Sequence, residues 1–124
     1  MPESPLRKRQ ALFWYKIAQV LIEAVRQSTP ICITEWIRDE ARQRILVARK
    51  ASKTMNSKHL TGLAVDFCFL ADIEDDGTIN WIPDKYKSLG EYAESIGLKW
   101  GGRFGDDPAT KTIEGWDAGH LELE

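Results

Sequence analysis

Two short motifs contain both histidines of this chain, together with carboxylates at fixed spacing. His59 precedes Asp66 by seven residues, and Asp117 precedes His120 by three. Imidazole and carboxylate groups are common zinc ligands, and a catalytic zinc has three protein ligands and one open position for water. We therefore predict that His59, Asp66 and His120 bind one Zn²⁺ ion. Asp117 is then the expected general base, which takes a proton from the water.

The spacing between His59 and Asp66 requires the chain to turn back on itself. Seven residues would span roughly 23 Å as a strand and about 10 Å as a helix, whereas zinc ligands place their donor atoms about 2 Å from the metal. Gly62 permits a tight turn between them. The next segment, Leu63 to Phe69, is predicted as a strand. Alternation along it separates a face with Ala64, Asp66 and Cys68 from a face with Leu63, Val65, Phe67 and Phe69.

The N-terminal region is predicted as a long amphipathic helix that ends near Ser28, with Pro30 as the stop. Ser4 is the expected cap, with Pro5 in the first turn. Apolar residues recur at helical spacing: Leu6, Phe13, Ile17, Val20, Leu21, Ala24 and Val25. The favoured interpretation is a helix packed on the sheet. A basic amphipathic helix that disturbs membranes is the alternative.

The remaining elements alternate between strands and helices. We expect a strand over Ile31 to Ile37, a helix capped by Asp39 and running to about Ala48, a helix from Asp84 to Ile96, a strand from Leu98 and a closing strand at His120. Residues 105–115 are polar and are expected to form a loop over the cleft. The predicted fold is α+β, a small antiparallel sheet that carries the zinc site with helices on its outer face. The length suits a single domain over residues 1–124.

Composition gives limits rather than a function. The net charge of −2 provides no overall attraction to nucleic acid or anionic membranes. The sequence shows neither a signal peptide nor an apolar run long enough for a transmembrane helix, so we expect synthesis in the cytoplasm. Basic residues gather in the middle of the chain: Arg42, Arg44, Arg49, Lys50, Lys53 and Lys58. They form either a solvated face or an attractive surface for an anionic polymer, and without interleaved aromatics they do not indicate nucleic-acid binding.

One acidic segment has two interpretations. Asp72, Glu74 and Asp76 match the opening of a calcium loop, but Pro83 stands where the last acidic ligand is expected. Asp76-Gly77 between apolar residues is also a hairpin signal, and a plain turn is the favoured interpretation over a Ca²⁺ site.

The two cysteines, Cys32 and Cys68, lie in apolar segments, which favours buried free thiols. The alternatives are a disulfide between them, or Cys68 as a zinc ligand.

Three ordered motifs resemble those of the LAS-type zinc peptidases, peptidase family M15. They are Ser57-x-His59-x-x-Gly62-x-Ala64-x-Asp66, then Gly97-Leu98-x-Trp100-Gly101-Gly102, then Asp117-x-x-His120-x-Glu122. The group comprises D-alanyl-D-alanine carboxypeptidases and dipeptidases and the L-alanyl-D-glutamate endopeptidases of phages and bacteria. The resemblance extends from about Ile33 to the C-terminus.

The resemblance also implies roles outside the metal ligands. Arg38 matches an arginine that contacts substrate and steadies the oxyanion, although Ile37 replaces the usual tyrosine and an exposed arginine at a helix start is the alternative. Trp100 matches a residue that borders the substrate cleft. Two roles stay open for Ser57, a hydrogen bond to substrate or support of the turn. Glu122 either fixes the tautomer of a ligand histidine or is an exposed strand residue.

Within the family, aspartate at the base position is typical of L-alanyl-D-glutamate peptidases, and glutamate of D-alanyl-D-alanine dipeptidases. Asp117 therefore favours an L-alanyl-D-glutamate endopeptidase that acts on bacterial peptidoglycan. The resemblance implies a phage endolysin, expected to be a monomer that accumulates in the host cytoplasm and reaches the wall after a holin opens the membrane. A bacterial wall-remodelling peptidase and a D-alanyl-D-alanine peptidase are alternatives. A zinc-containing wall-binding module without activity is the alternative from another class.

Overall fold

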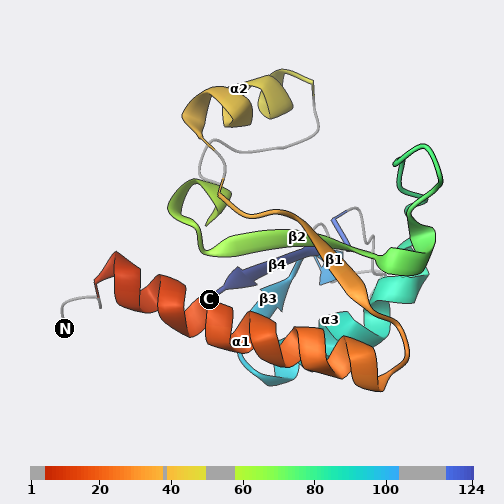
Figure 1. Ribbon diagram of the computed structural model, residues 1–124. Coiled ribbons are helices and arrows are strands. Elements are labelled where there is room, and N and C mark those ends of the chain that lie inside the picture. The colour runs from red at the N-terminus through yellow and green to blue at the C-terminus, as the bar shows by residue number, and fades with distance from the viewer. Residues whose placement is uncertain (1–4, 38, 50–57, 104–116) are drawn as a thin grey trace, which may run out of the picture.

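A four-stranded antiparallel sheet forms the centre of the fold (Figure 1). The computed structural model describes residues 5–37, 39–49, 58–103 and 117–124. The order across the sheet is β1 (Ile31–Glu35), β2 (Ala64–Phe69), β4 (His120–Leu123) and β3 (Leu98–Trp100). The helices are α1 (Leu6–Arg26), α2 (Glu40–Ala48) and α3 (Lys87–Ser95). The architecture is the predicted α+β fold.

The helices α1 and α3 pack on one face of the sheet, while α2 lies apart from them beyond the end of β1 (Figure 1). The face of β2 toward these helices carries Val65, Phe67 and Phe69, preceded by Leu63, each at most 3% exposed. The matching stripe on α1 is Phe13, Ile17, Val20 and Ala24. Complete burial of a large apolar side chain contributes about 1.5–3 kcal/mol, so this layer holds the sheet against its helices. The opposite face of β2 carries Asp66.

The apolar stripe of α1 is narrower than predicted. Leu6 and Val25 are 43% and 67% exposed. Val25 follows Ala24 by one position, which rotates its side chain about 100° away from the core. At the N-terminus, Pro5 is the cap residue and lies directly before the helix, which corrects the prediction of Pro5 in the first turn. Ser4 lies outside the described residues.

Two boundaries also differ from the prediction. β1 ends at Glu35, because its register with β2 shifts between Ile33 and Glu35 and the Trp36 side chain then donates from Nε1 to the carbonyl oxygen of Gly62 at 2.8 Å. The predicted helix from Asp84 begins as a 3-10 turn (Pro83–Tyr86) and becomes α-helical only at Lys87. The predicted Asp39 cap is correct, since its side chain accepts from the Arg42 backbone N–H at 2.7 Å.

The acidic segment forms the predicted turn. Ile73 pairs with Ile79, and Gly77 takes the left-handed conformation with φ +87°. The Asp76 carboxylate accepts from the backbone and hydroxyl of Thr78, and Asp72 Oδ1 accepts from Lys85 Nζ at 2.5 Å. These carboxylates have protein partners, and within the described ranges the metal-capable group is His59, Asp66 and His120. The Ca²⁺ alternative stays untested.

Cys32 and Cys68 face each other across β1 and β2 as free thiols. Burial raises the pKa of the Cys68 thiol. The favoured interpretation is correct for Cys68, a buried free thiol, whereas Cys32 is a free thiol that is only partly buried.

No helix within the described ranges combines the length and the apolar character that spanning a bilayer requires.

Candidate metal centre

Three separate elements bring the predicted zinc ligands together. His59 lies in a 3-10 turn (Lys58–Thr61), and the chain reverses at Gly62 with φ +69° before it enters β2. Asp66 is directly opposite His120 in the register of β2 and β4. The turn and the strand pairing therefore solve the spacing problem that the sequence posed, and Gly62 is the residue whose conformation permits it.

The ligand atoms of the three residues converge. His59 Nε2 and His120 Nδ1 lie 3.2 and 3.1 Å from the same oxygen of Asp66, and one ligand atom from each residue lies within 4.8 Å of the others. Both histidines are almost fully buried, at 1% and 5% exposure. A group this compact, with two imidazoles and one carboxylate, has the composition of a catalytic zinc site with an open position.

A contact on the side of the ring away from Asp66 fixes the orientation of His59. Its Nδ1 lies 2.8 Å from the backbone carbonyl of Trp36, which can only accept, so Nδ1 carries a hydrogen and Nε2 is the nitrogen that would offer its lone pair to a bound metal. Trp36 also holds the turn through its indole bond to Gly62. One tryptophan thus positions both the ligand and the reversal after it.

His120 faces Asp66 with Nδ1, whereas His59 faces it with Nε2. Its Nε2 lies 2.9 Å from Glu122 Oε1, which leaves Nδ1 directed at Asp66. Glu122 is two residues along the same strand and its side chain is 12% exposed. Lys58 Nζ lies 4.0 Å from the other Glu122 oxygen. Carboxylates that accept from a ligand histidine fix its tautomer and make it a stronger ligand. Of the two roles left open for Glu122, this contact favours the first.

The electrostatics of the group favour a cation. Burial alone would raise the pKa of Asp66, but hydrogen bonds from His120 and His59 and their charges hold it well below its usual range. Burial alone would lower the pKa of His120, but hydrogen bonds to Asp66 and Glu122 and the charge of Asp117 raise it to about 9. The negative charge of the three carboxylates around the two imidazoles thus stabilises positive charge at this site. A bound divalent cation would be stabilised in the same way. The donor set therefore fits a zinc ion.

Asp117 lies beside this centre. One of its carboxylate oxygens is 3.8 Å from His120 Nδ1, and the side chain is 34% exposed. The tight turn into β4 places it there, because the His120 backbone N–H donates to the Asp117 carbonyl at 3.0 Å. The backbone of Gly101 packs against this turn so closely that a Cβ there would lie 2.2 Å from the Asp117 carbonyl oxygen. Only a residue without a side chain fits at position 101 in this arrangement.

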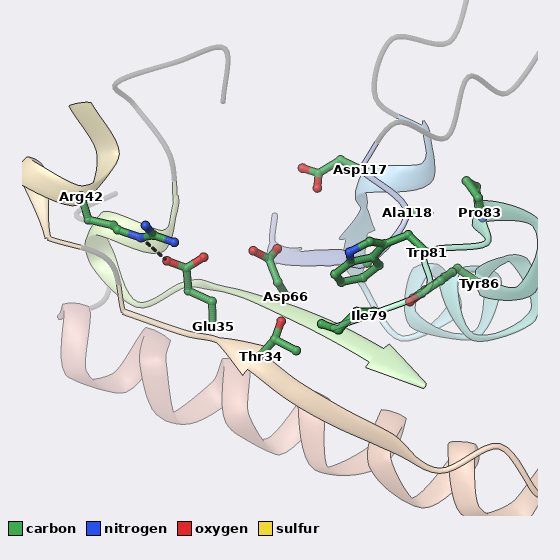
Figure 2. A pocket seen from close by; sticks show the side chains of 11 residues that line it. Thr34, Glu35, Arg42, Asp66, Ile79, Trp81, Pro83, Tyr86, Asp117 and Ala118 are labelled. Atoms are coloured by element: carbon green, nitrogen blue, oxygen red, sulfur yellow. Dashed lines mark ion pairs between the residues drawn. The ribbon is translucent and has the colours of Figure 1, made fainter. Parts of the chain in front are cut away.

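A cavity of about 570 Å³ opens over Asp66 and Asp117. Figure 2 shows Asp66 near its middle, Asp117 on the side away from β2, the Arg42 and Glu35 pair at one end and Trp81 at the other. The volume is typical of small-molecule and peptide sites. Its lining is completed by Thr34, Ile79, Pro83, Tyr86, Ala118 and Gly119.

Other predicted site residues have different outcomes. Arg38 and Ser57 lie outside the described residues, and so does the loop predicted over residues 105–115. Trp100 is 3% exposed, is absent from the cavity lining, and donates from Nε1 to the Ala118 carbonyl at 2.8 Å. It supports the turn next to Asp117 from within the core, and its predicted place at the border of the substrate cleft stays a prediction.

The sequence interpretation missed two residues that line the cavity and one buried residue of α2. Arg42 was grouped with the basic middle of the chain, and Trp81 was given no role, but both line the cavity. Gln43 is fully buried, the one such residue that the structure describes in α2. A buried amide on an otherwise solvated helix leaves no periodic signal, so the sequence offered no means of finding it.

Comparisons with known proteins agree with this geometry. The family model described as D-alanyl-D-alanine carboxypeptidase, of the M15 peptidases, matches residues 50–123. The L-alanyl-D-glutamate peptidase of Listeria phage A118 is 37% identical over 75 residues, 58% of this chain and 25% of the relative. The chain thus spans about a quarter of the length of that curated relative.

Solved structures share the fold. The L-Ala D-Glu endopeptidase ChiX of Serratia marcescens is 28% identical with a TM-score of 0.59, over 86% of this chain and 77% of that one. The vancomycin-resistance D,D-pentapeptidase VanY, solved with Zn(II), is 18% identical with a TM-score of 0.60, over 90% of this chain and 70% of that one. At this identity VanY is informative about the fold alone. The family model covers more than half of the sequence, so the chain belongs to the M15 peptidases, the LAS-type group that its motifs resemble.

Proposed function

We propose that the protein is a zinc peptidase that hydrolyses peptidoglycan stem peptides at the L-alanyl-D-glutamate bond. The observation that supports this most is the convergence of His59, Asp66 and His120, with Asp117 beside them and lining the same cavity as Asp66. The phage A118 relative and ChiX are both named for this bond. We further propose a single catalytic domain that serves as a phage endolysin in host-cell lysis.

In this proposal His59, Asp66 and His120 hold the zinc ion through Nε2, a carboxylate oxygen and Nδ1. The metal would act as a Lewis acid that makes water more acidic and polarises the scissile carbonyl. Trp36 and Glu122 keep both imidazoles in the ligating tautomer. These two contacts orient both imidazoles toward Asp66.

In this proposal Asp117 acts first as the general base and then as the general acid. Its carboxylate takes a proton from the attacking water, whose oxygen joins the carbonyl carbon, and returns that proton to the nitrogen as the C–N bond breaks. The 34% exposure of Asp117 leaves it accessible to water and substrate, while its 3.8 Å separation from His120 Nδ1 keeps it next to the metal position. The products are a free carboxylate and a free amine.

The closest competing reaction is cleavage of a D-alanyl-D-alanine bond, which the description of the family model favours. The test is to digest purified peptidoglycan with zinc-loaded protein and identify the fragments by mass spectrometry. We expect new amino termini on D-glutamate. New amino termini on D-alanine instead would replace the proposed bond with the competing one.

A zinc-containing binding module without activity is the second competing class. It would bind peptidoglycan in a sedimentation assay but release no new amino termini at any zinc concentration. That result would remove the proposed activity and leave only the metal site.

A further inference from the structure

The cavity has two unlike ends. At one end are Arg42 of α2 and Glu35 of β1, and at the other is Trp81, which is 50% exposed and stacks on Tyr86 with ring centroids 6.1 Å apart (Figure 2). Asp66 lies between the two ends, so a peptide with its scissile bond over the metal position would have one side near a cation and the other near an aromatic ring. The charged end could select substrates by the charge of the group next to the scissile bond.

Arg42 is placed to donate to a ligand. Its side chain is 51% exposed, and its Nε lies 3.8 Å from Glu35 Oε1, beyond hydrogen-bond distance. Glu35 is the acidic group that it contacts among the described residues. A guanidinium presents five N–H donors in a planar fork that matches a carboxylate. The Glu35 carboxylate is close enough to attract this guanidinium but accepts no hydrogen bond from its Nε.

The backbone fixes this position. Asp39 caps α2 by accepting from the Arg42 backbone N–H at 2.7 Å, so Arg42 is in the first turn of the helix. Glu35 is aligned with Asp66 in the register of β1 and β2, directly after the bulge. Both members of the pair are therefore held by regular structure close to the metal centre.

The proposed substrate has the complementary group. Glutamate carries two carboxyl groups, and a peptide that continues through one of them leaves the other as a free carboxylate. In an L-alanyl-D-glutamate substrate, that carboxylate belongs to the residue directly after the scissile bond. The alanine on the other side of the bond carries only a methyl group.

We propose that Arg42 binds the free carboxylate of the glutamate residue adjacent to the scissile bond, and so selects substrates in which this group is ionised rather than amidated. The inference rests on the proposed function and deepens it. Charge-assisted hydrogen bonds contribute about 1.5–3 kcal/mol, so the loss of one in a half-exposed site corresponds to about tenfold or more in kcat/KM.

The test uses two synthetic peptides of the form acetyl-L-Ala-γ-D-Glu-L-Lys-amide. One has the free α-carboxylate on glutamate and the other an α-carboxamide, and neither has another carboxylate. For zinc-loaded wild-type protein we expect kcat/KM about tenfold higher for the acid than for the amide. Arg42→Gln should reduce the acid-to-amide ratio to about one by slowing acid cleavage, with the change mainly in KM.

The matched control is Arg44→Gln. Arg44 is on the same helix, is 70% exposed and pairs with Glu40, and it does not line the cavity. This variant should keep the wild-type ratio. Because both peptides are measured on the same enzyme sample, a loss of folded protein changes both rates and leaves the ratio unaffected. Arg42→Lys keeps the charge without the fork and should give an intermediate ratio.

Several results would overturn the inference. Equal cleavage of both peptides by the wild type would do so while leaving the proposed bond intact. An unchanged ratio in Arg42→Gln, or an equal loss of the ratio in Arg44→Gln, would show that Arg42 does not read this carboxylate. Cleavage of neither peptide, together with wall digestion at another bond, would instead remove the proposed function and the inference with it.

Discussion

Glu122 and Asp66 contact opposite nitrogens of one imidazole, that of His120. Glu122 Oε1 lies 2.9 Å from Nε2 and Asp66 Oδ1 lies 3.1 Å from Nδ1. Glu122, which is not itself one of the three metal-binding residues, therefore decides which nitrogen of His120 faces Asp66. His59 is held in the same manner by a backbone carbonyl, with the nitrogens reversed. The two histidines thus face the centre with opposite nitrogens, and each ring is held by its own partner on the other side.

The contact between Glu122 and His120 predicts a role in metal affinity. Glu122→Gln should weaken zinc binding by about 10- to 100-fold, because the amide no longer supports the ligating tautomer with a charged acceptor. Competition with a zinc indicator dye measures the affinity. Glu91→Gln, an exposed position on α3, is the control and should bind zinc normally. Equal affinity in the two variants would remove this role of Glu122.

Asp117 is predicted to serve catalysis without holding the metal. Asp117→Asn should lower kcat by about 100- to 10,000-fold, the usual range for loss of a general base, and keep zinc at one ion per chain. Peptidoglycan digestion and metal analysis of the same sample provide both measurements. Asp84→Asn, at an exposed position on the 3-10 turn before α3, makes the same chemical change away from the site. Undiminished activity in Asp117→Asn would exclude it as the base.

Zinc is predicted to stabilise the fold as well as to support activity. A ligand that binds only the folded state at 100 times its Kd adds about 2.7 kcal/mol to the free energy of unfolding. Exhaustive chelation should therefore lower Tm and abolish activity, and added zinc should restore both. Differential scanning calorimetry with and without chelator measures the shift. His120→Ala should show no zinc-dependent change in Tm, and a normal shift in that variant would contradict its role as a ligand.

Close packing at Gly101 predicts sensitivity to a single methyl group. A Cβ there would lie 2.2 Å from the Asp117 carbonyl oxygen and 2.7 Å from His120 Cβ, so Gly101→Ala must displace the turn that carries both residues. We expect weaker zinc binding and lower activity. Gly77→Ala is the matched control, since no heavy atom lies within 4 Å of its Cβ position. Its left-handed φ should cost about 1–2 kcal/mol of stability but leave zinc affinity unchanged.

Local chemistry made several elements predictable. The Asp39 cap, the reversal at Gly62 and the turn at Gly77 depend on the residue itself and its immediate neighbours. The apolar alternation along β2 needed only the period of a strand. A prediction failed where tertiary contacts decide, as at Trp36, whose bond to Gly62 accompanies an early end of β1. The burial of Trp100 is likewise set by the fold and has no local signal.

The sequence by itself determined which side chains this protein has for metal and proton chemistry, because two histidines and nearby carboxylates at family spacing narrow the possible ligands. Only the tertiary structure decided which ring nitrogen of each histidine faces the centre, since that choice depends on Trp36 and Glu122 across strands and turns. It also decided that Arg42 and Trp81 share a cavity with Asp66. Residues from three separate segments meet there through packing, which no local pattern encodes.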